Sequence, residues 1–197
     1  MKSLIPLLVL PLVAGCATIA DKDWTASGAK SAAAVRSTTP NNGGKGELIS
    51  GLNRVDYVSG VGSNGAEAYA GLEHDIPVAV LPTSGTALYS GPWEVGGVTD
   101  IFVLTSSDFE GTLYGTSFTD GGMITLTSDF DVGTLTGTSG LLTINGTFTG
   151  QTVGGTVTYD GTSGPLAGRI GSSDVIGAFH GNDDSQVFGG GFFASAP

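Results

Sequence analysis

The chain has little cysteine and few basic residues. Of its 197 residues one is Cys, 7 are Lys or Arg, and 18 are Asp or Glu, which gives a net charge of −11. A single Cys cannot form an intramolecular disulfide, so no disulfide framework holds the fold. The acidic balance excludes nucleic acid as a partner, because binding a phosphate backbone needs clustered Lys and Arg. The apolar run from Leu4 to Val13 is too short to span a bilayer as a helix, which takes ~20 residues.

Glycine and apolar residues are abundant. The chain has 34 Gly and 8 Pro, and 40% of its residues are hydrophobic. Glycine inside a helix costs ~1 kcal/mol relative to Ala, so long helices are not expected. The Gly residues follow no three-residue period, which excludes a collagen-like chain, and the apolar content is high enough for a folded core.

The first residues have the form of a secretory signal. Residues 1–15 combine a basic Lys2 with an apolar run and small residues before Cys16. The stretch LVAGC at 12–16 resembles the bacterial lipobox, in which the Cys is lipidated and becomes the first mature residue. Ala17 rather than Asp follows it, which by the sorting rule of enteric bacteria favours the outer membrane. The alternative is an ordinary signal peptide with a Cys near its end.

The rest of the chain divides into three parts by composition. Residues 16–46 are rich in Ala, Ser, Thr and Lys and are expected to form a lipidated, flexible tether. Residues 47–82 are mixed and are expected to form a small N-terminal cap or handle, with a helical turn in the segment GAEAYAGLEHD. From residue 83 to 197 the pattern is that of β-strands.

Apolar and hydroxyl side chains alternate through this last part. Ile124, Leu126 and Phe130 share one strand face, and Thr125 and Thr127 share the other, which is typical of an antiparallel sheet with one solvated face. We predict an all-β fold: a single antiparallel up-and-down eight-stranded β-barrel with a small N-terminal cap or handle, in preference to an open sandwich. The strands are expected, with one pair merging, near 86–95, 98–106, 109–119, 122–130, 133–138 joined to 141–149, 153–160, 165–171, 174–180 and 186–194.

Several short motifs carry a family resemblance. GAFHGND at 177–183 followed by GGGF at 189–192, LPTSGTALYSG at 81–91, and FD at 130–131 with TLTG at 134–137 resemble the strands of transferrin-binding-protein-like surface lipoproteins. The resemblance implies an eight-stranded barrel, often with a handle domain, on a lipidated tether at the outer membrane. Members bind transferrin, lactoferrin, complement factor H or haem proteins through long loops. The loops expected here are short, so none of these specificities carries over.

Three residues are candidates for ligand binding. His74 or His180 is a potential axial haem ligand, with Met123 or Tyr69 as the second ligand. The alternative is that His74 is a solvated residue between two carboxylates and that His180 ends a strand at a turn. Trp93 follows the break at Gly91-Pro92 and is expected to be an exposed anchor for a partner, whereas most other aromatic residues are expected in the barrel core.

The acidic pairs do not predict a metal site. Asp129 with Asp131, and Asp183 with Asp184, lack the spacing of a calcium loop, and solvated turn carboxylates are the expected alternative. No G-x-S-x-G nucleophile motif accompanies either His, so no enzymatic activity and no resident metal are expected.

Together these features predict a non-enzymatic, outer-membrane lipoprotein that binds a protein or small ligand through its loops or cap. Haem would be the only cofactor to consider. Two other functions remain open: haem or iron acquisition, and a structural envelope lipoprotein without a defined ligand.

Overall fold

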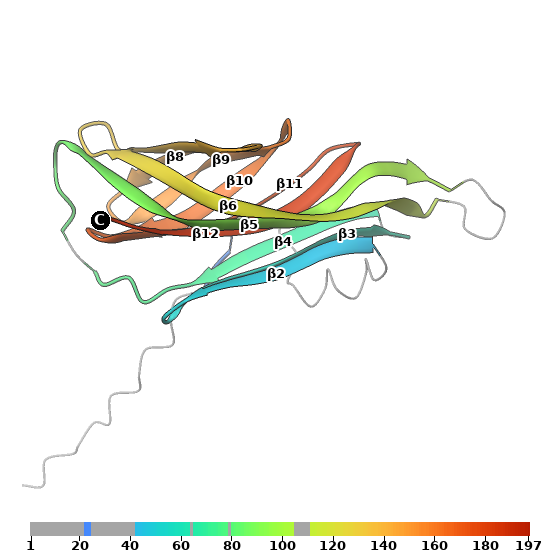
Figure 1. The fold of residues 1–197 in the computed structure, drawn as a ribbon, viewed down its shortest axis with the longest axis horizontal. Coiled ribbons are helices and arrows are strands. Elements are labelled where there is room, and N and C mark those ends of the chain that lie inside the picture. Colours follow the sequence, from blue (N-terminus) through green and yellow to red (C-terminus); the bar gives the residue numbers. More distant parts are fainter. Residues whose placement is uncertain (1–21, 25–41, 64, 79, 105–110) are drawn as a thin grey trace, which may run out of the picture.

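Two β-sheets make up the computed structural model, which describes residues 22–24, 42–63, 65–78, 80–104 and 111–197 (Figure 1). One is a four-stranded sheet of order β1-β4-β3-β2, and the other is a closed eight-stranded barrel. Within these ranges every regular element is a strand, and accordingly no helix there is long and apolar enough to cross a membrane. The predicted all-β barrel with an N-terminal handle is confirmed.

The barrel is an up-and-down antiparallel meander in which each strand pairs with its chain neighbour and β12 closes on β5. Its strands are β5 (Thr86–Val103), β6 (Leu113–Asp129), β7 (Thr134–Ser139), β8 (Leu142–Thr149), β9 (Thr152–Tyr159), β10 (Thr162–Ile170), β11 (Asp174–Asn182) and β12 (Gln186–Ser195). Closure leaves the barrel without the two edges of an open sheet.

The expected strand ends are wrong at three places. Gly96-Gly97 and Gly121-Gly122 lie inside the long strands β5 and β6 rather than at turns, while 133–149 is two strands that meet at Gly140. The glycines inside β5 and β6 are required by close packing. A Cβ on Gly96 would lie 3.1 Å from the Cα of Gly44 in the neighbouring sheet, and one on Gly122 would lie 3.3 Å from the indole nitrogen of Trp93.

In the barrel core, aromatic rings lie opposite glycines of the adjacent strand. Phe179 pairs with Gly190 across β11 and β12, and Phe192 pairs with Gly177. Both phenylalanines have no exposed surface, and a Cβ on Gly190 would lie 2.7 Å from the ring of Phe179. Many of the glycines therefore make room for a ring on the adjacent strand, a use distinct from turn formation.

The N-terminal sheet, called the handle sheet below, consists of β1 (Lys22–Trp24), β2 (Asn42–Ser50), β3 (Asn53–Gly62) and β4 (Gly65–Glu73). The helical turn expected in GAEAYAGLEHD is wrong, because this segment is β4. Ala70 and Leu72 are buried against the barrel, and Tyr69 and Glu73 occupy the opposite face. This period of two is that of a strand.

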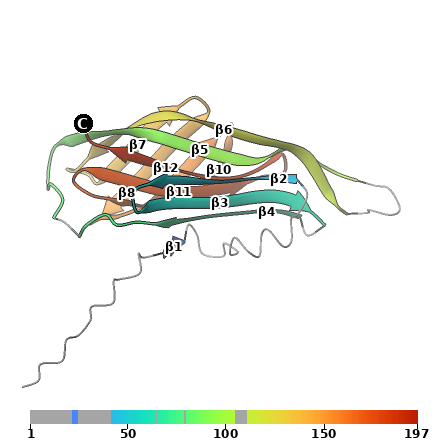
Figure 2. The same ribbon diagram turned by 60° about the horizontal axis from the view of Figure 1, so that its bottom comes forward.

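The handle sheet packs along the barrel wall made by β5, β11 and β12 (Figure 2). Val55 and Leu72 from the handle sheet share one buried cluster with Ile176 and Ala178 from β11. A second cluster joins Val61 to barrel valines. The wall of the barrel is therefore apolar on both faces under the handle sheet.

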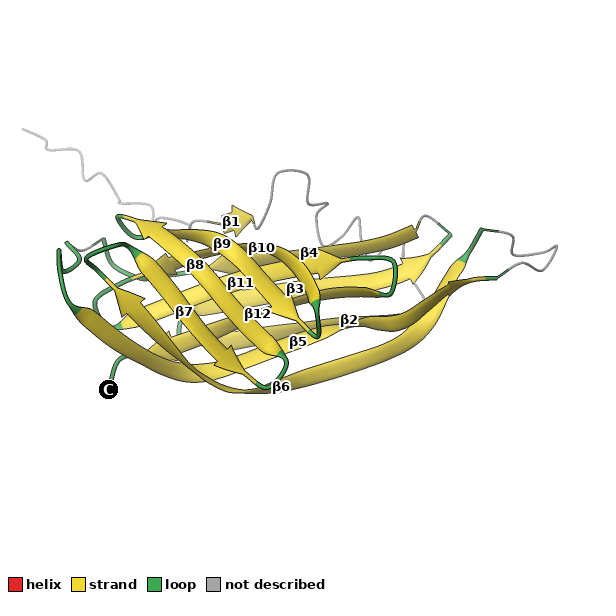
Figure 3. Cartoon of the chain, turned by 90° about the horizontal axis from the view of Figure 1, so that it is seen from above, coloured by secondary structure: helices red, strands yellow, loops and turns green. Residues whose placement is uncertain are grey.

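The β5–β6 hairpin extends past the rim of the barrel (Figures 1 and 3). We call its outer part, residues 99–103 and 113–117, the arm. A register shift between Thr99 and Phe102 coincides with Asp100, whose φ is 53°. The Ile101 amide donates a hydrogen bond to the Ser185 carbonyl (3.3 Å), so the base of the arm is tied to the β11–β12 turn.

Candidate binding site at the arm and the adjoining barrel mouth

Side chains fill the barrel, so its described cavities lie at the two ends. The mouth beside the arm holds a cavity of about 330 Å³, which we call the arm-side mouth. Its lining residues are Thr99, Phe118, Thr119, Asp120, Tyr159, Asp160 and Gln186. Because β5 and β6 continue above this mouth, the arm forms one wall of an open depression.

Two stacked aromatic pairs line this region. Phe118 stacks on Tyr159 at 5.5 Å between ring centroids and an interplanar angle of 7°. Farther out, Phe102 stacks on Tyr114 at 6.2 Å and 29°. Phe102 is 54% exposed. Large, exposed aromatic side chains of this kind are common anchors in protein interfaces.

The charged groups that line the mouth are both acidic, Asp120 and Asp160. The Tyr159 hydroxyl donates to Asp120 Oδ2 (2.9 Å), and burial, followed by this hydrogen bond and the nearby carboxylates, raises the pKa of Tyr159. The phenol therefore stays protonated and continues to donate well above neutral pH. Asp160 is exposed in the β9–β10 turn with a φ of 46°.

More carboxylates occupy the neighbouring β11–β12 turn. Hydrogen bonds from the Thr162 hydroxyl and the Ser185 backbone lower the pKa of Asp183 to about 2, so this group is charged at all physiological pH values. The only Lys or Arg after Arg54 is Arg169, which lies in β10 toward the other end of the barrel and donates to Thr152 Oγ1 (3.3 Å). The arm end of the described barrel is thus uniformly acidic.

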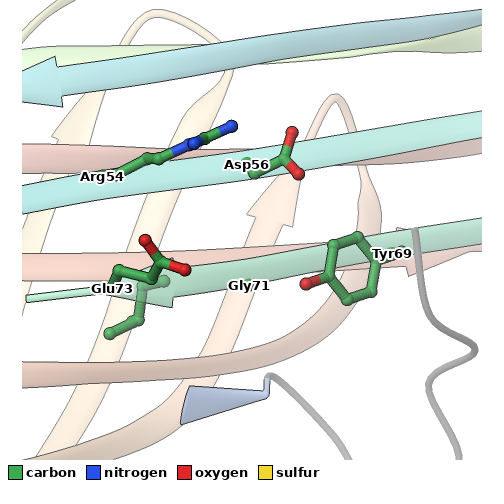
Figure 4. A pocket seen from close by; sticks show the side chains of 6 residues that line it. Arg54, Asp56, Tyr69, Gly71 and Glu73 are labelled. Atoms are coloured by element: carbon green, nitrogen blue, oxygen red, sulfur yellow. The ribbon is translucent and has the colours of Figure 1, made fainter. Parts of the chain in front are cut away.

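Two other cavities are weaker candidates. On the outer face of the handle sheet, Arg54, Asp56, Tyr69 and Glu73 surround a depression of about 60 Å³ (Figure 4). This volume suits a few waters, and Arg54 already pairs with Glu47. The opposite mouth of the barrel holds about 480 Å³ between apolar residues and the connection from the handle sheet, without charged residues in its lining.

The exposed position expected for Trp93 is wrong. Trp93 is 4% exposed, packs in the barrel core, and donates from Nε1 to Ser139 Oγ (3.0 Å). The break expected at Gly91-Pro92 does not end the strand, since Pro92 pairs with Met123 inside β5 and β6. The period of two therefore continues through the proline and directs Trp93 inward.

The surroundings expected for the two histidines are also wrong. His74 is 7% exposed rather than solvated, because the Asp75 amide donates to Asn53 Oδ1 (3.0 Å) and Ile76 packs beneath the handle sheet. His180 lies within β11, paired with Gly189, rather than at a turn. Haem ligation by either remains a prediction, and Cys16 lies outside the described residues.

The paired carboxylates Asp129 and Asp131 accept hydrogen bonds from backbone amides. Asp129 Oδ1 accepts from the Asp131 amide (2.9 Å), and Asp131 Oδ2 accepts from the Gly85 amide (3.1 Å). Across the ranges that the structure describes, no group of three or more His, Cys, Asp or Glu side chains is placed to hold a metal ion.

The sequence interpretation missed the arm. It placed Phe102 and Tyr114 on two expected strands with their side chains in the barrel core, whereas Phe102 is more than half exposed beyond the rim. A usable signal was the combined length of β-forming sequence from 86 to 104 and from 111 to 129, once Gly96-Gly97 and Gly121-Gly122 are taken as strand positions. That length exceeds what one crossing of a small barrel needs.

No protein-family model matches the chain, and no curated protein sequence matches it. Solved structures do. A surface lipoprotein is 16% identical with a TM-score of 0.52, and a transferrin binding protein B (TbpB) variant from Actinobacillus pleuropneumoniae is 17% identical with a TM-score of 0.50. Each comparison covers 84% of both chains.

A longer TbpB variant from Haemophilus parasuis is 14% identical with a TM-score of 0.50. The match covers 81% of this chain and 38% of that one, so the present chain corresponds to part of the longer protein. At such identities the likeness concerns the fold alone. With its closed eight-stranded barrel and its handle sheet, this chain has a TbpB-like fold.

Proposed function

We propose that this chain is a non-enzymatic, lipid-anchored outer-membrane binding protein that engages a protein partner through the arm and the arm-side mouth. The observation that carries the proposal is the stacked pair of Phe102 and Tyr114 beyond the barrel rim, with Phe102 54% exposed. Exposing an aromatic pair to water is unfavourable in the free protein, and this free energy is recovered when a partner covers the pair.

The fold supports the same function. The neighbours of similar fold include a surface lipoprotein and transferrin binding proteins, and the latter are binding proteins by name. In the arm-side mouth, the Asp120 carboxylate accepts hydrogen bonds from the Tyr159 phenol and from the Gly121 amide. The identity of the partner protein is left to experiment.

Removing the aromatic pair is expected to abolish partner binding without unfolding the protein. The test uses the full chain, purified in detergent, to capture proteins from envelope and host extracts, and then measures saturable binding of whichever protein is captured. Phe102→Ser with Tyr114→Ser should weaken that binding at least tenfold. The matched control is Val132→Ser, which changes an apolar residue that is 69% exposed in the β6–β7 turn. Equal binding by both variants would place the site elsewhere.

Changing Cys16 to Ser is expected to release the protein from membranes. Each buried acyl CH₂ contributes ~0.8 kcal/mol, so two or three chains hold a protein stably and their loss leaves no anchor. The measurement is incorporation of labelled fatty acid together with membrane fractionation. If the Cys16→Ser protein remained in the membrane fraction, the lipid anchor would be wrong.

A further inference from the structure

One edge of β6 is unpaired over most of its length. β6 pairs with β5 from Leu113 to Asp129, but with β7 only from Thr127 to Asp129. Beyond that short ladder, the hydroxyl of Ser139, the last residue of β7, donates to the Met123 carbonyl (2.7 Å). From Leu113 to Gly122, no strand in the described parts of the chain pairs with this side of β6, which we call the free edge.

The free edge has few of the features that protect edge strands. Natural edges carry Lys or Pro, a bulge that turns them away, or a covering element. Leu113–Gly122 contains neither Lys nor Pro, and Thr116, Ser117 and Thr119 are exposed. The Asp120 side chain, the only charge in this segment, is held at the mouth by Tyr159. Backbone donors and acceptors are therefore accessible to an added strand.

Charge selects what such a strand would carry. An extended segment along the free edge would pass Asp120 and Asp160, and the barrel has no Lys or Arg apart from the distant Arg169. Lys or Arg side chains at alternate positions would face these carboxylates and the rings of Phe118 and Tyr114, which favour cations on their faces. A second copy of this chain is a poor occupant, because two acidic edges of a chain with charge −11 would face each other.

We propose that the free edge of β6 binds an extended, Lys- or Arg-bearing segment of a partner protein by β-strand addition. The proposal rests on the proposed function and specifies the partner's chemistry at the same site. Backbone hydrogen bonds to β6 supply affinity, and the acidic, aromatic mouth selects basic side chains.

The test uses a fluorescein-labelled peptide in which Arg and Thr alternate, titrated with the full chain in detergent and followed by fluorescence anisotropy. Methylating alternate backbone nitrogens keeps the charge but removes the N–H donors along one edge of the peptide strand, and two such peptides, methylated at complementary positions, test the two edges in turn. We expect one of the two to lose at least tenfold in affinity. Bound peptide should also slow amide exchange in Leu113–Gly122 and leave β8 unchanged.

A charge variant tests selectivity. Asp160→Asn keeps a residue that tolerates the positive φ of this turn. It should weaken the affinity for the Arg-Thr peptide about two- to fivefold. A Glu-Thr peptide should not bind. Equal affinity of both methylated peptides and the parent would overturn strand addition, because charge alone would then explain binding. Concentration-dependent dimers protected along β6 would overturn the choice of occupant.

The two proposals fail in different ways. If captured partner binding requires Phe102 and Tyr114 but the Arg-Thr peptide does not bind, strand addition is wrong and the proposed function stands. If neither binding occurs, the site itself is wrong.

Discussion

Gly190→Ala is expected to lower the free energy of unfolding by about 1–3 kcal/mol, the usual cost of overpacking a core. A Cβ at this position would overlap the Glu94 carbonyl oxygen on one side and lie 2.7 Å from the Phe179 ring on the other. Neither group has room to move, since Glu94 belongs to the adjacent strand and Phe179 has no exposed surface. The loss should appear in urea denaturation and as a lower melting temperature, by ~2–4 °C per kcal/mol.

The matched control is Gly154→Ala in β9. Gly154 also lies in a barrel strand, but nothing stands within 4 Å of its Cβ position and its φ is not in the left-handed region. Ala restricts the unfolded chain more than Gly does, so this variant should be unchanged or slightly more stable. Equal destabilisation by the two substitutions would show that glycine is needed for backbone flexibility rather than for ring packing.

Tyr57→Phe is expected to destabilise the protein by about 1–3 kcal/mol at neutral pH, the cost of a lost hydrogen bond to a partly buried charged group. Tyr57 has no exposed surface, and its hydroxyl donates from the handle sheet to the Glu94 carboxylate on the barrel wall. Removing the hydroxyl leaves Glu94 without this donor at the interface between the two sheets.

The same pair predicts a loss of stability in alkali. Burial and the neighbouring Glu94 raise the pKa of Tyr57 above its ordinary value of 10.0, so the folded protein keeps a proton that the unfolded chain releases. Its contribution is complete below pH ~10 and falls by up to ~1.4 kcal/mol per pH unit above that. Tyr57→Phe should therefore flatten the stability curve above pH 10.

Tyr114→Phe provides the comparison for this pH effect, because this substitution also removes one phenol but lies on the arm, away from the interface between the two sheets. Tyr89 and Tyr159, whose pKa values are also raised, remain in every variant, so the difference between variants isolates Tyr57. Parallel curves for wild type and Tyr57→Phe from pH 9 to 11 would contradict a protonated Tyr57 at the interface.

Alternation predicted the faces of the strands well and their ends poorly. Ile124 and Leu126 are buried and Thr125 and Thr127 are exposed, as the period of two requires. Strand ends were misplaced because glycine has two uses in this chain. Gly140 turns the chain with a φ of 58°, whereas Gly96 continues a strand beneath the handle sheet, and the local sequence of the two positions does not separate them.

The candidate site was predicted less well than the fold. Trp93 and Phe102 both occur in β5, yet the first is 4% exposed and the second 54%. Which of them faces solvent depends on where the rim of the barrel falls along a strand of continuous β-forming sequence. That position is set by the turns of β7–β8 and β9–β10, which lie far away in the chain.

By itself, the sequence determined the class of the protein. Few basic residues, many glycines and an apolar–polar alternation with a period of two specify an acidic, all-β barrel, because composition and alternation are local properties of the chain. Only the tertiary structure decided which glycines pack against an aromatic ring, where the handle sheet packs and how far β6 runs without a partner strand. These depend on contacts between strands distant in the chain, and those contacts follow from register and barrel closure.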